Sequence, residues 1–126
     1  MICLDSSAWV EIFRGGSRKE AFVKILESAG PVLVPSVCLV EVGRVLHREY
    51  GAEGAAVCMA SMCEHEVVPL GIEEAKLAVG SGLEHRLPFV DSIIYATARR
   101  HHATLVTMDA DFRGLEGVRF FPKKIS

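Results

Sequence analysis

The sequence predicts an α/β fold in which helices cover both faces of a mainly parallel sheet. Three observations lead to this prediction: predicted strands and helices alternate along the chain, the strands are short and almost continuously apolar, and 126 residues suit one domain spanning 1–126. A sheet with one wet face would alternate apolar and polar residues along each strand. These strands are therefore expected to be buried on both faces.

The first half of the chain supplies two strands and four helices. The strands are brief apolar runs, and the helices show apolar residues at helical spacing. Gly15 and Gly16 separate the first two helices, Ser36 is expected to cap the third, and Gly51 is expected to end it. In order, the elements are a strand at 2–5, helices at 8–15 and 18–29, a strand at 31–35, and helices at 36–50 and 53–64.

The second half continues the alternation of strands and helices. Pro88 suits the start of a helix, because its fixed φ is helical and its missing N–H would have no partner there. The apolar segment after Pro88 predicts a largely buried helix. In order, the elements are a strand at 66–70, helices at 72–85 and 88–102, a strand at 103–107, the turn DADF, and a strand at 117–121.

Composition excludes several classes of protein. The net charge of −2 excludes a globally basic nucleic-acid binder but permits a local basic patch. No apolar run approaches the ~18 residues that a membrane span needs, and the start MICLDSSAW lacks the basic region of a signal peptide. We therefore expect a soluble, cytoplasmic protein. Because half of its residues are hydrophobic, part of its surface is expected to be covered by another subunit or a partner.

The four cysteines do not predict a disulfide framework, because they form no C-x-x-C pair and no signal peptide precedes them. A zinc site built from Cys58, Cys63 and His65 is an alternative. Their spacing matches no closed tetrahedral pattern, which argues against it.

Three aspartates occupy positions that indicate a site. Asp5 and Asp109 each follow a predicted strand, and ligands of open α/β sheets bind outside the carboxyl ends of strands. Asp91 lies in the first turn of its helix, where the helix dipole favours a carboxylate. It also shares a helix face with the apolar Ile94 and Ala98, which favours an inward orientation.

Glu41 interrupts an apolar run on its predicted helix. It either forms an ordinary ion pair with Arg44 or Arg48, or it lines a cleft. Helical spacing places apolar residues, among them Val37 and Val45, on the same side as Glu41. These neighbours favour the cleft.

Convergence of these acids would require a cation. Two carboxylates about 4 Å apart repel by roughly 1 kcal/mol in water and about 4 kcal/mol at an effective dielectric constant near 20. No His or Cys stands at ligand spacing beside them, and oxygen ligands select Mg²⁺ or Mn²⁺. Such ions orient a phosphate, lower the pKa of a bound water and stabilise an in-line displacement. Phosphodiester hydrolysis is the predicted chemistry.

Thr107 and Asp111 are further candidates beside Asp109. In an extended strand, Thr107 projects to the same face as Asp109, where it would hold a water or orient the carboxylate. Asp111 is either an outer ligand or a cap for the turn that follows, and we favour the cap.

Four segments together resemble the PIN-domain ribonucleases, specifically the VapC-type toxins of toxin–antitoxin modules. They are ICLDSSAWVEIF, PSVCLVEVGRVL, LPFVDSIIYATARRHHATLVTMDADF and GVRFF, and in order they span nearly the whole chain. The resemblance implies a three-layer α/β/α sandwich, dependence on Mg²⁺ or Mn²⁺, and endonucleolytic RNA cleavage that leaves a 5′ phosphate.

The resemblance also implies particular site residues and partners. The acidic quartet of the family falls on Asp5, Glu41, Asp91 and Asp109, with Thr107 at the accessory hydroxyl position. Ser6 matches a position that commonly holds a small hydroxyl residue near the site. The family further implies a homodimer and a small antitoxin whose C-terminal segment lies over the active-site groove.

Other charged residues and other functions are weighed against this hypothesis. His101 and His102 suit the carboxyl end of a helix and are interpreted as structural. An aspartate-nucleophile phosphatase would place its D-x-D motif near the N-terminus, which argues against this class. A phospho-receiver domain needs a mid-chain aspartate, which this sequence lacks. A catalytically inactive PIN-like binding module stays open. The cations considered for RNA contact are Arg14, Arg18, Lys19, Arg44, Arg48, Arg86, Arg99 and Arg113.

Overall fold

The computed structural model describes residues 1–124 and contains one five-stranded sheet. All neighbouring strands pair in parallel, in the order β3-β2-β1-β4-β5. This confirms the predicted parallel sheet. The strands are β1 (Ile2–Leu4), β2 (Val32–Pro35), β3 (Glu66–Val68), β4 (Thr104–Thr107) and β5 (Val118–Phe120).

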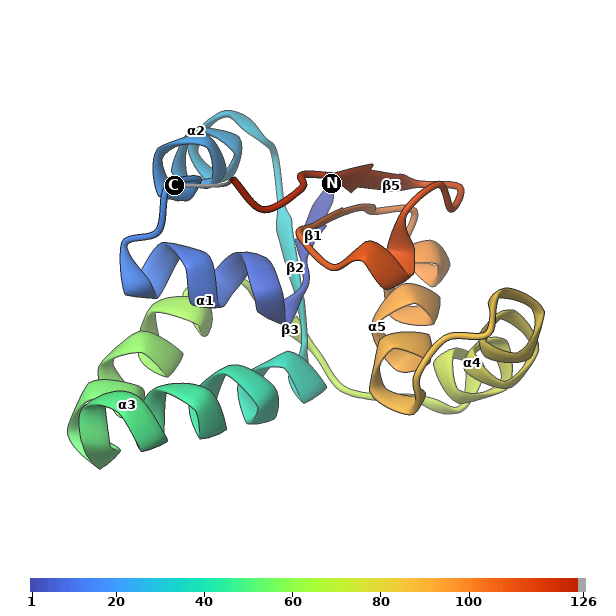
Figure 1. Ribbon diagram of the computed structural model, residues 1–126. Helices are drawn as coiled ribbons and strands as arrows, with labels where there is room; N and C mark the ends of the chain where they lie inside the picture. The colour runs from blue at the N-terminus through green and yellow to red at the C-terminus, as the bar shows by residue number, and fades with distance from the viewer. Residues whose placement is uncertain (125–126) are drawn as a thin grey trace.

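Helices cover both faces of this sheet, as predicted, and complete a three-layer sandwich. In Figure 1, α1, α2 and α3 lie on one side of the strands and α4 and α5 on the other. The chain winds outward from β1 to β3 and then returns to β4 on the other side of β1, so right-handed crossovers place the two sets of helices on opposite faces. The helices are α1 (Ser6–Arg14), α2 (Lys19–Ser28), α3 (Ser36–Met62), α4 (Ile72–His85), α5 (Phe89–Arg100) and the short 3₁₀ helix η1 (Ala110–Phe112).

The strand order creates a crevice between β1 and β4. The chain leaves these adjacent strands in opposite directions, and ligands of open α/β sheets bind at such a switch point. Asp5 follows β1 and Asp109 follows β4. The topology therefore brings together two aspartates that are more than 100 residues apart in the sequence.

Several predicted element boundaries shift in the structure. The helices expected at 36–50 and 53–64 are two arms of α3 that meet at Gly51, whose φ of 81° and ψ of 175° interrupt the helical backbone. Pro35 occupies the cap position of α3, so the prediction that Ser36 caps it is wrong by one residue, and Ser36 is the first helical residue. Helix α5 ends at Arg100, because His102 adopts a φ of 57°.

The core lies between the sheet and its helices. The strand residues Leu4, Leu33 and Leu105 are fully buried, and so are Phe22 of α2 and Phe112 of η1. Fully burying a side chain of this size contributes about 1.5–3 kcal/mol to stability. Packing on both faces explains why the strands are almost continuously apolar. Within the described residues, no helix combines the length and apolar character required to span a membrane.

Candidate active site

Asp5 anchors the site from the end of β1. As the N-cap of α1, its Oδ1 accepts hydrogen bonds from the backbone N–H of Ala8 at 3.1 Å and from the hydroxyl of Ser7 at 2.7 Å. Its Oδ2 accepts a hydrogen bond from the hydroxyl of Thr107 at 2.7 Å. The residue is 3% exposed, and burial raises the pKa of its carboxyl to about 6, although these hydrogen bonds oppose the shift.

Thr107 connects Asp5 to the loop that carries Asp109. Its fully buried hydroxyl donates to Asp5 and accepts a hydrogen bond from the backbone N–H of Asp109 at 2.8 Å. The sequence offered two roles for Thr107, holding a water or orienting a carboxylate, and this geometry agrees with the second. The carboxylate is that of Asp5, however, and the hydroxyl fixes Asp109 through its backbone.

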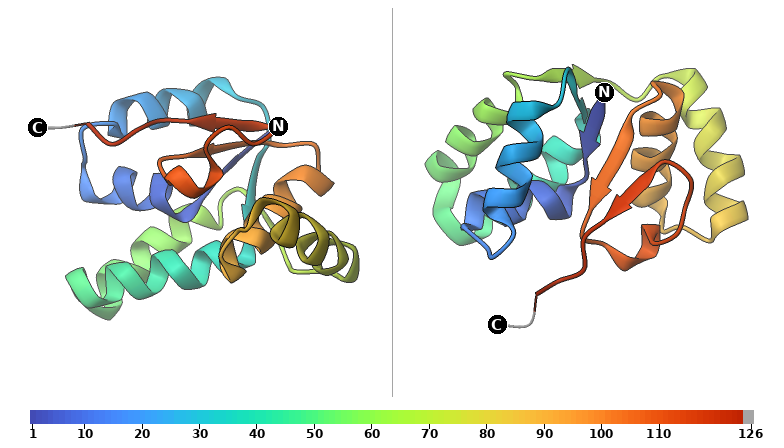
Figure 2. Two further views of the ribbon diagram at one scale, coloured as in Figure 1. Left: turned by 45° about the vertical axis from the view of Figure 1, so that its right-hand side comes forward. Right: turned by 90° about the horizontal axis from the view of Figure 1, so that it is seen from above.

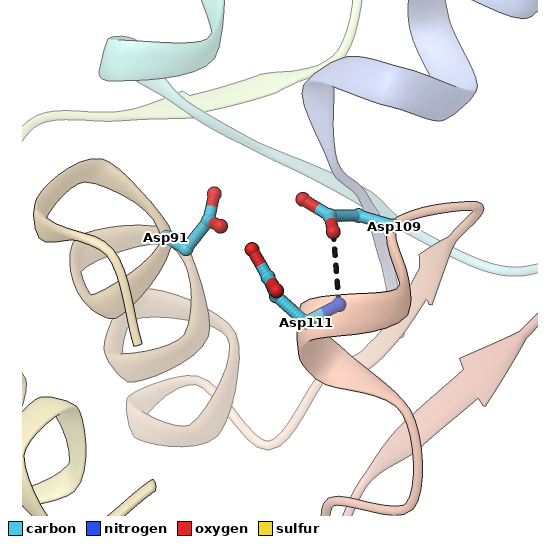
Figure 3. A group of neighbouring side chains, drawn as sticks. All are labelled: Asp91, Asp109 and Asp111. Carbon is cyan, nitrogen blue, oxygen red and sulfur yellow. Dashed lines mark hydrogen bonds between the residues drawn. The ribbon is translucent and has the colours of Figure 1, made fainter. Parts of the chain in front are cut away.

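Asp91, Asp109 and Asp111 form the densest part of the site. One carboxylate oxygen of each lies within 4.8 Å of the others. Figure 3 shows the three side chains directed toward one another from α5, from the segment after β4 and from η1. This group brings carboxylate oxygens from α5, from the segment after β4 and from η1 to one small volume.

The structure corrects the role expected for Asp111. Asp109 is the N-cap of η1, because its Oδ1 accepts a hydrogen bond from the backbone N–H of Asp111 at 2.9 Å. The cap thus belongs to Asp109, and the exposed carboxylate of Asp111 lies beside that of Asp91. The sequence carried a signal for this arrangement, since two aspartates separated by one residue at a tight turn can present both carboxylates to one side.

The pKa of Asp91 reflects its proximity to the other acids. Burial, followed in decreasing order by the negative charges of Asp109, Glu41, Asp5 and Asp111, raises the pKa of its carboxyl to about 7. Asp91 thus faces the other acids, as its helix face predicted, and their negative charge makes the ionisation of Asp91 less favourable.

Glu41 joins the site through Ser6. The Ser6 hydroxyl donates a 2.6 Å hydrogen bond to Oε1 of Glu41, and Ser6 follows Asp5 directly in the chain. Among residues 1–124, neither Arg44 nor Arg48 forms an ion pair with Glu41. The cleft interpretation of Glu41 agrees with this geometry, and Ser6 lies near the acids as the resemblance implied.

The donor set suits a hard divalent cation. Every candidate ligand atom is a carboxylate oxygen, which Mg²⁺ and Mn²⁺ prefer over the nitrogen and sulfur ligands of zinc sites. Two oxygens on opposite sides of a Mg²⁺ ion lie about 4 Å apart. The three aspartates offer oxygens that all lie within 4.8 Å of one another, so these residues fit such an ion.

Comparison with known proteins assigns the fold. A profile of the PIN domain matches residues 2–118. The chain belongs to the PIN-domain family. Among curated proteins, no sequence matches this PIN domain significantly.

Solved structures share the architecture of this PIN domain at low sequence identity. A toxin–antitoxin complex from Klebsiella pneumoniae matches with a TM-score of 0.81 and 22% identity, covering 99% of this chain and 100% of that chain. Mycobacterium tuberculosis VapC20, described as a sarcin-ricin loop cleaving toxin, matches with a TM-score of 0.73 and 23% identity over 94% and 99% of the two chains. VapBC2 from Rickettsia felis, bound to a promoter DNA fragment, matches with a TM-score of 0.75 and 16% identity over 97% and 98%.

Proposed function

We propose that this PIN domain is a Mg²⁺- or Mn²⁺-dependent endoribonuclease and the toxin of a toxin–antitoxin pair. The observation that carries the proposal is the convergence of five acids from β1, α3, α5 and the β4–η1 segment at the switch point of a parallel sheet. The family assignment and the similarity to toxins with solved structures support the same function. An intact acid set also argues against an inactive binding module.

The residues have distinct roles in this proposal. Asp5, Glu41, Asp91 and Asp109 hold the cation, and Asp111 is a further ligand because of its position beside Asp91. When bound, the ion lowers the pKa of a water and neutralises charge on the scissile phosphate. Thr107 is a positioning residue, because its hydroxyl fixes both the Asp5 carboxylate and the Asp109 backbone. The product of this chemistry carries a 5′ phosphate.

The proposal includes partners. The complexes formed by similar toxins support a small antitoxin that covers the active-site groove. A homodimer agrees with the exposed apolar side chains on and around α4 and α5, which are Leu70, Ile72, Leu77, Val79, Leu83 and Phe89. The cytoplasmic location expected from the sequence stays a prediction.

The proposal is tested by cleavage of a mixed RNA pool by the purified chain, followed by sequencing of the new 5′ ends. We expect cleavage with Mg²⁺ or Mn²⁺, none with EDTA, and a loss of at least about 100-fold in Glu41→Gln, since one charge that holds the ion is removed. Glu73→Gln is the matched control, because Glu73 is exposed on α4 and its one ion pair among residues 1–124 is with Lys76. Cleavage by Glu41→Gln at the rate of the parent would exclude the proposed site.

A further inference from the structure

At the carboxyl end of β5, Arg18 and Arg119 contact the ring of one phenylalanine, and Arg113 contacts the ring of the phenylalanine before it. The guanidinium carbons of Arg18 and Arg119 lie 5.5 and 4.9 Å from the centre of the Phe121 ring, and that of Arg113 lies 5.8 Å from the centre of the Phe120 ring. We call Arg18, Arg113 and Arg119 the arginine cluster. Contact with a ring face positions a guanidinium and leaves its N–H donors available.

Within residues 1–124, no carboxylate forms an ion pair with the arginine cluster. In the described part of the chain, every ion pair involves other cations. Residues 113–124 carry four cations against one acid, Glu116, which contacts Arg99 instead. A net charge of +3 on twelve residues is therefore concentrated in a chain whose total charge is −2.

The segment that carries the cluster is held firmly against the fold. Arg18 donates a 2.6 Å hydrogen bond from Nε to the backbone carbonyl of Pro122, and the Phe121 ring packs edge-on against Phe22 at 5.2 Å. The backbone N–H of Phe121 donates to the carbonyl of Thr107 at 2.8 Å. These contacts hold Arg18 and Phe121 in place. The guanidinium carbons of Arg18 and Arg119 lie within 10.4 Å of each other, because both lie near the centre of the Phe121 ring.

The arginine cluster lies one strand away from the acids. Strands β4 and β5 run side by side to the same edge of the sheet (Figure 2, right), and Phe120 pairs with Thr107, which contacts Asp5. Neighbouring strands are about 4.8 Å apart. A nucleic-acid strand that leaves the acidic site across β5 therefore meets the arginines next.

We propose that the arginine cluster binds backbone phosphates of single-stranded RNA on one side of the scissile bond. This inference rests on the proposed nuclease function and names the part of the surface that holds the substrate. Arginine forks match phosphate oxygens, and guanidinium planes also stack on unpaired bases. Two fixed guanidiniums at this spacing can contact neighbouring phosphates of one strand. Their attraction offsets the repulsion that the acids exert on the same backbone.

The test measures binding of fluorescein-labelled dodecauridylate by anisotropy between 50 and 200 mM NaCl, in an Asp91→Asn background that does not consume the RNA. Removing one phosphate contact lowers the slope of log K against log salt by about 0.7 for single strands. We expect this decrease, with a several-fold weaker affinity at low salt, for Arg119→Gln and for Arg113→Gln. Arg119→Lys keeps the charge and is expected to keep the slope. Circular dichroism verifies that each variant is folded.

Arg100→Gln is the matched control, because Arg100 is exposed at the end of α5, about 14 Å along the helix from Asp91. Parent-like affinity and slope in both cluster variants would overturn the inference. That result would favour an acidic segment of a protein partner as the ligand of these arginines. An equal loss in Arg100→Gln would overturn it too. If the parent cleaves RNA while the cluster variants bind normally, this inference fails alone. If RNA binds through the cluster but is never cleaved, the nuclease proposal fails alone.

Discussion

At the scale of single residues, the site combines acids that are individually costly to ionise. Asp5 is almost completely buried, and Asp91 faces four other carboxylates. Both groups have a raised pKa in the folded chain, near 6 and near 7, whereas an unfolded aspartate titrates near 3.8. The ion-free fold is therefore strained electrostatically at neutral pH, and a bound cation would relieve the strain.

This electrostatic cost predicts how stability depends on pH. A raised pKa in the folded state means that the folded chain holds more protons between pH 4 and 7, so the stability that these groups contribute is complete below about pH 4 and is lost as pH rises toward 7. In EDTA, Asp91→Asn is thus expected to be more stable than the parent at pH 7.5, on the order of 1–2 kcal/mol after screening by solvent is allowed for. Near pH 4 the two proteins should melt alike.

Thermal melts of both proteins across pH 4–8 check this prediction, because the difference between them isolates Asp91 from other titrating groups. Mg²⁺ should raise the melting temperature of the parent at pH 7.5 and raise that of Asp91→Asn much less. Parallel stability curves for the two proteins in EDTA would contradict the electrostatic account.

At the scale of elements, the kink in α3 shapes a groove between the two arms of this helix. Gly51 turns the second arm of α3 back toward the first, and the arms approach so closely that a Cβ on Gly43 would lie 2.7 Å from Sδ of Met59. The arms enclose a groove of about 510 Å³ lined by both arms, including Leu39, Val40 and Ala55. One glycine conformation thus determines the shape of this surface.

Two glycine substitutions, one at the kink and one inside α4, are expected to have opposite effects on the free energy of unfolding. Gly51→Ala is expected to reduce the free energy of unfolding by about 1–3 kcal/mol, because the φ of 81° and ψ of 175° are essentially restricted to glycine. Gly80→Ala, inside α4 with open space around its Cβ position, is expected to stabilise by about 0.5–1 kcal/mol. Urea unfolding of both variants measures the two effects, and equal stability of Gly51→Ala and the parent would show that the kink is not required.

At the scale of the whole molecule, the exposed apolar side chains on and around α4 and α5 form the surface on which the proposed homodimer would assemble. Leu83 and Phe89 are 78% and 80% exposed, and Ile72 is 75% exposed. A twofold interface would use each of these side chains twice. These exposed side chains contribute to the hydrophobic content of 50% in the sequence.

A homodimer through this surface predicts a specific assembly defect. Leu83→Lys removes the burial of one leucine in each subunit, worth about 1.5–3 kcal/mol apiece, and inserts two charges. The dissociation constant of the dimer should therefore rise at least about 100-fold. Light scattering during size exclusion should show a dimeric parent and a monomeric variant. Val57→Lys is the control, since Val57 is 72% exposed but lies on α3. A dimeric Leu83→Lys would exclude Leu83 from the interface.

The sequence by itself determined the fold class and predicted most residues of the candidate site. Apolar runs of strand length, separated by amphipathic helices, have few compact arrangements, because each apolar face must be buried on both sides of a parallel sheet. The same logic placed Asp5 and Asp109 at one edge of the sheet. Helical spacing predicted that Asp91 and Glu41 face inward, toward Asp5 and Asp109.

The tertiary structure alone decided which acids meet and how they are held. The capping role of Asp109, the position of Asp111 beside Asp91, and the hydrogen bond from Ser6 to Glu41 depend on loop geometry and on contacts across the strand order. The grouping of Arg18 with Arg119 depends on Phe121, which packs against a helix 99 residues earlier in the chain. Local periodicity reports the side of an element that is buried, whereas the distance between two side chains on different elements is set by the packing of the whole chain.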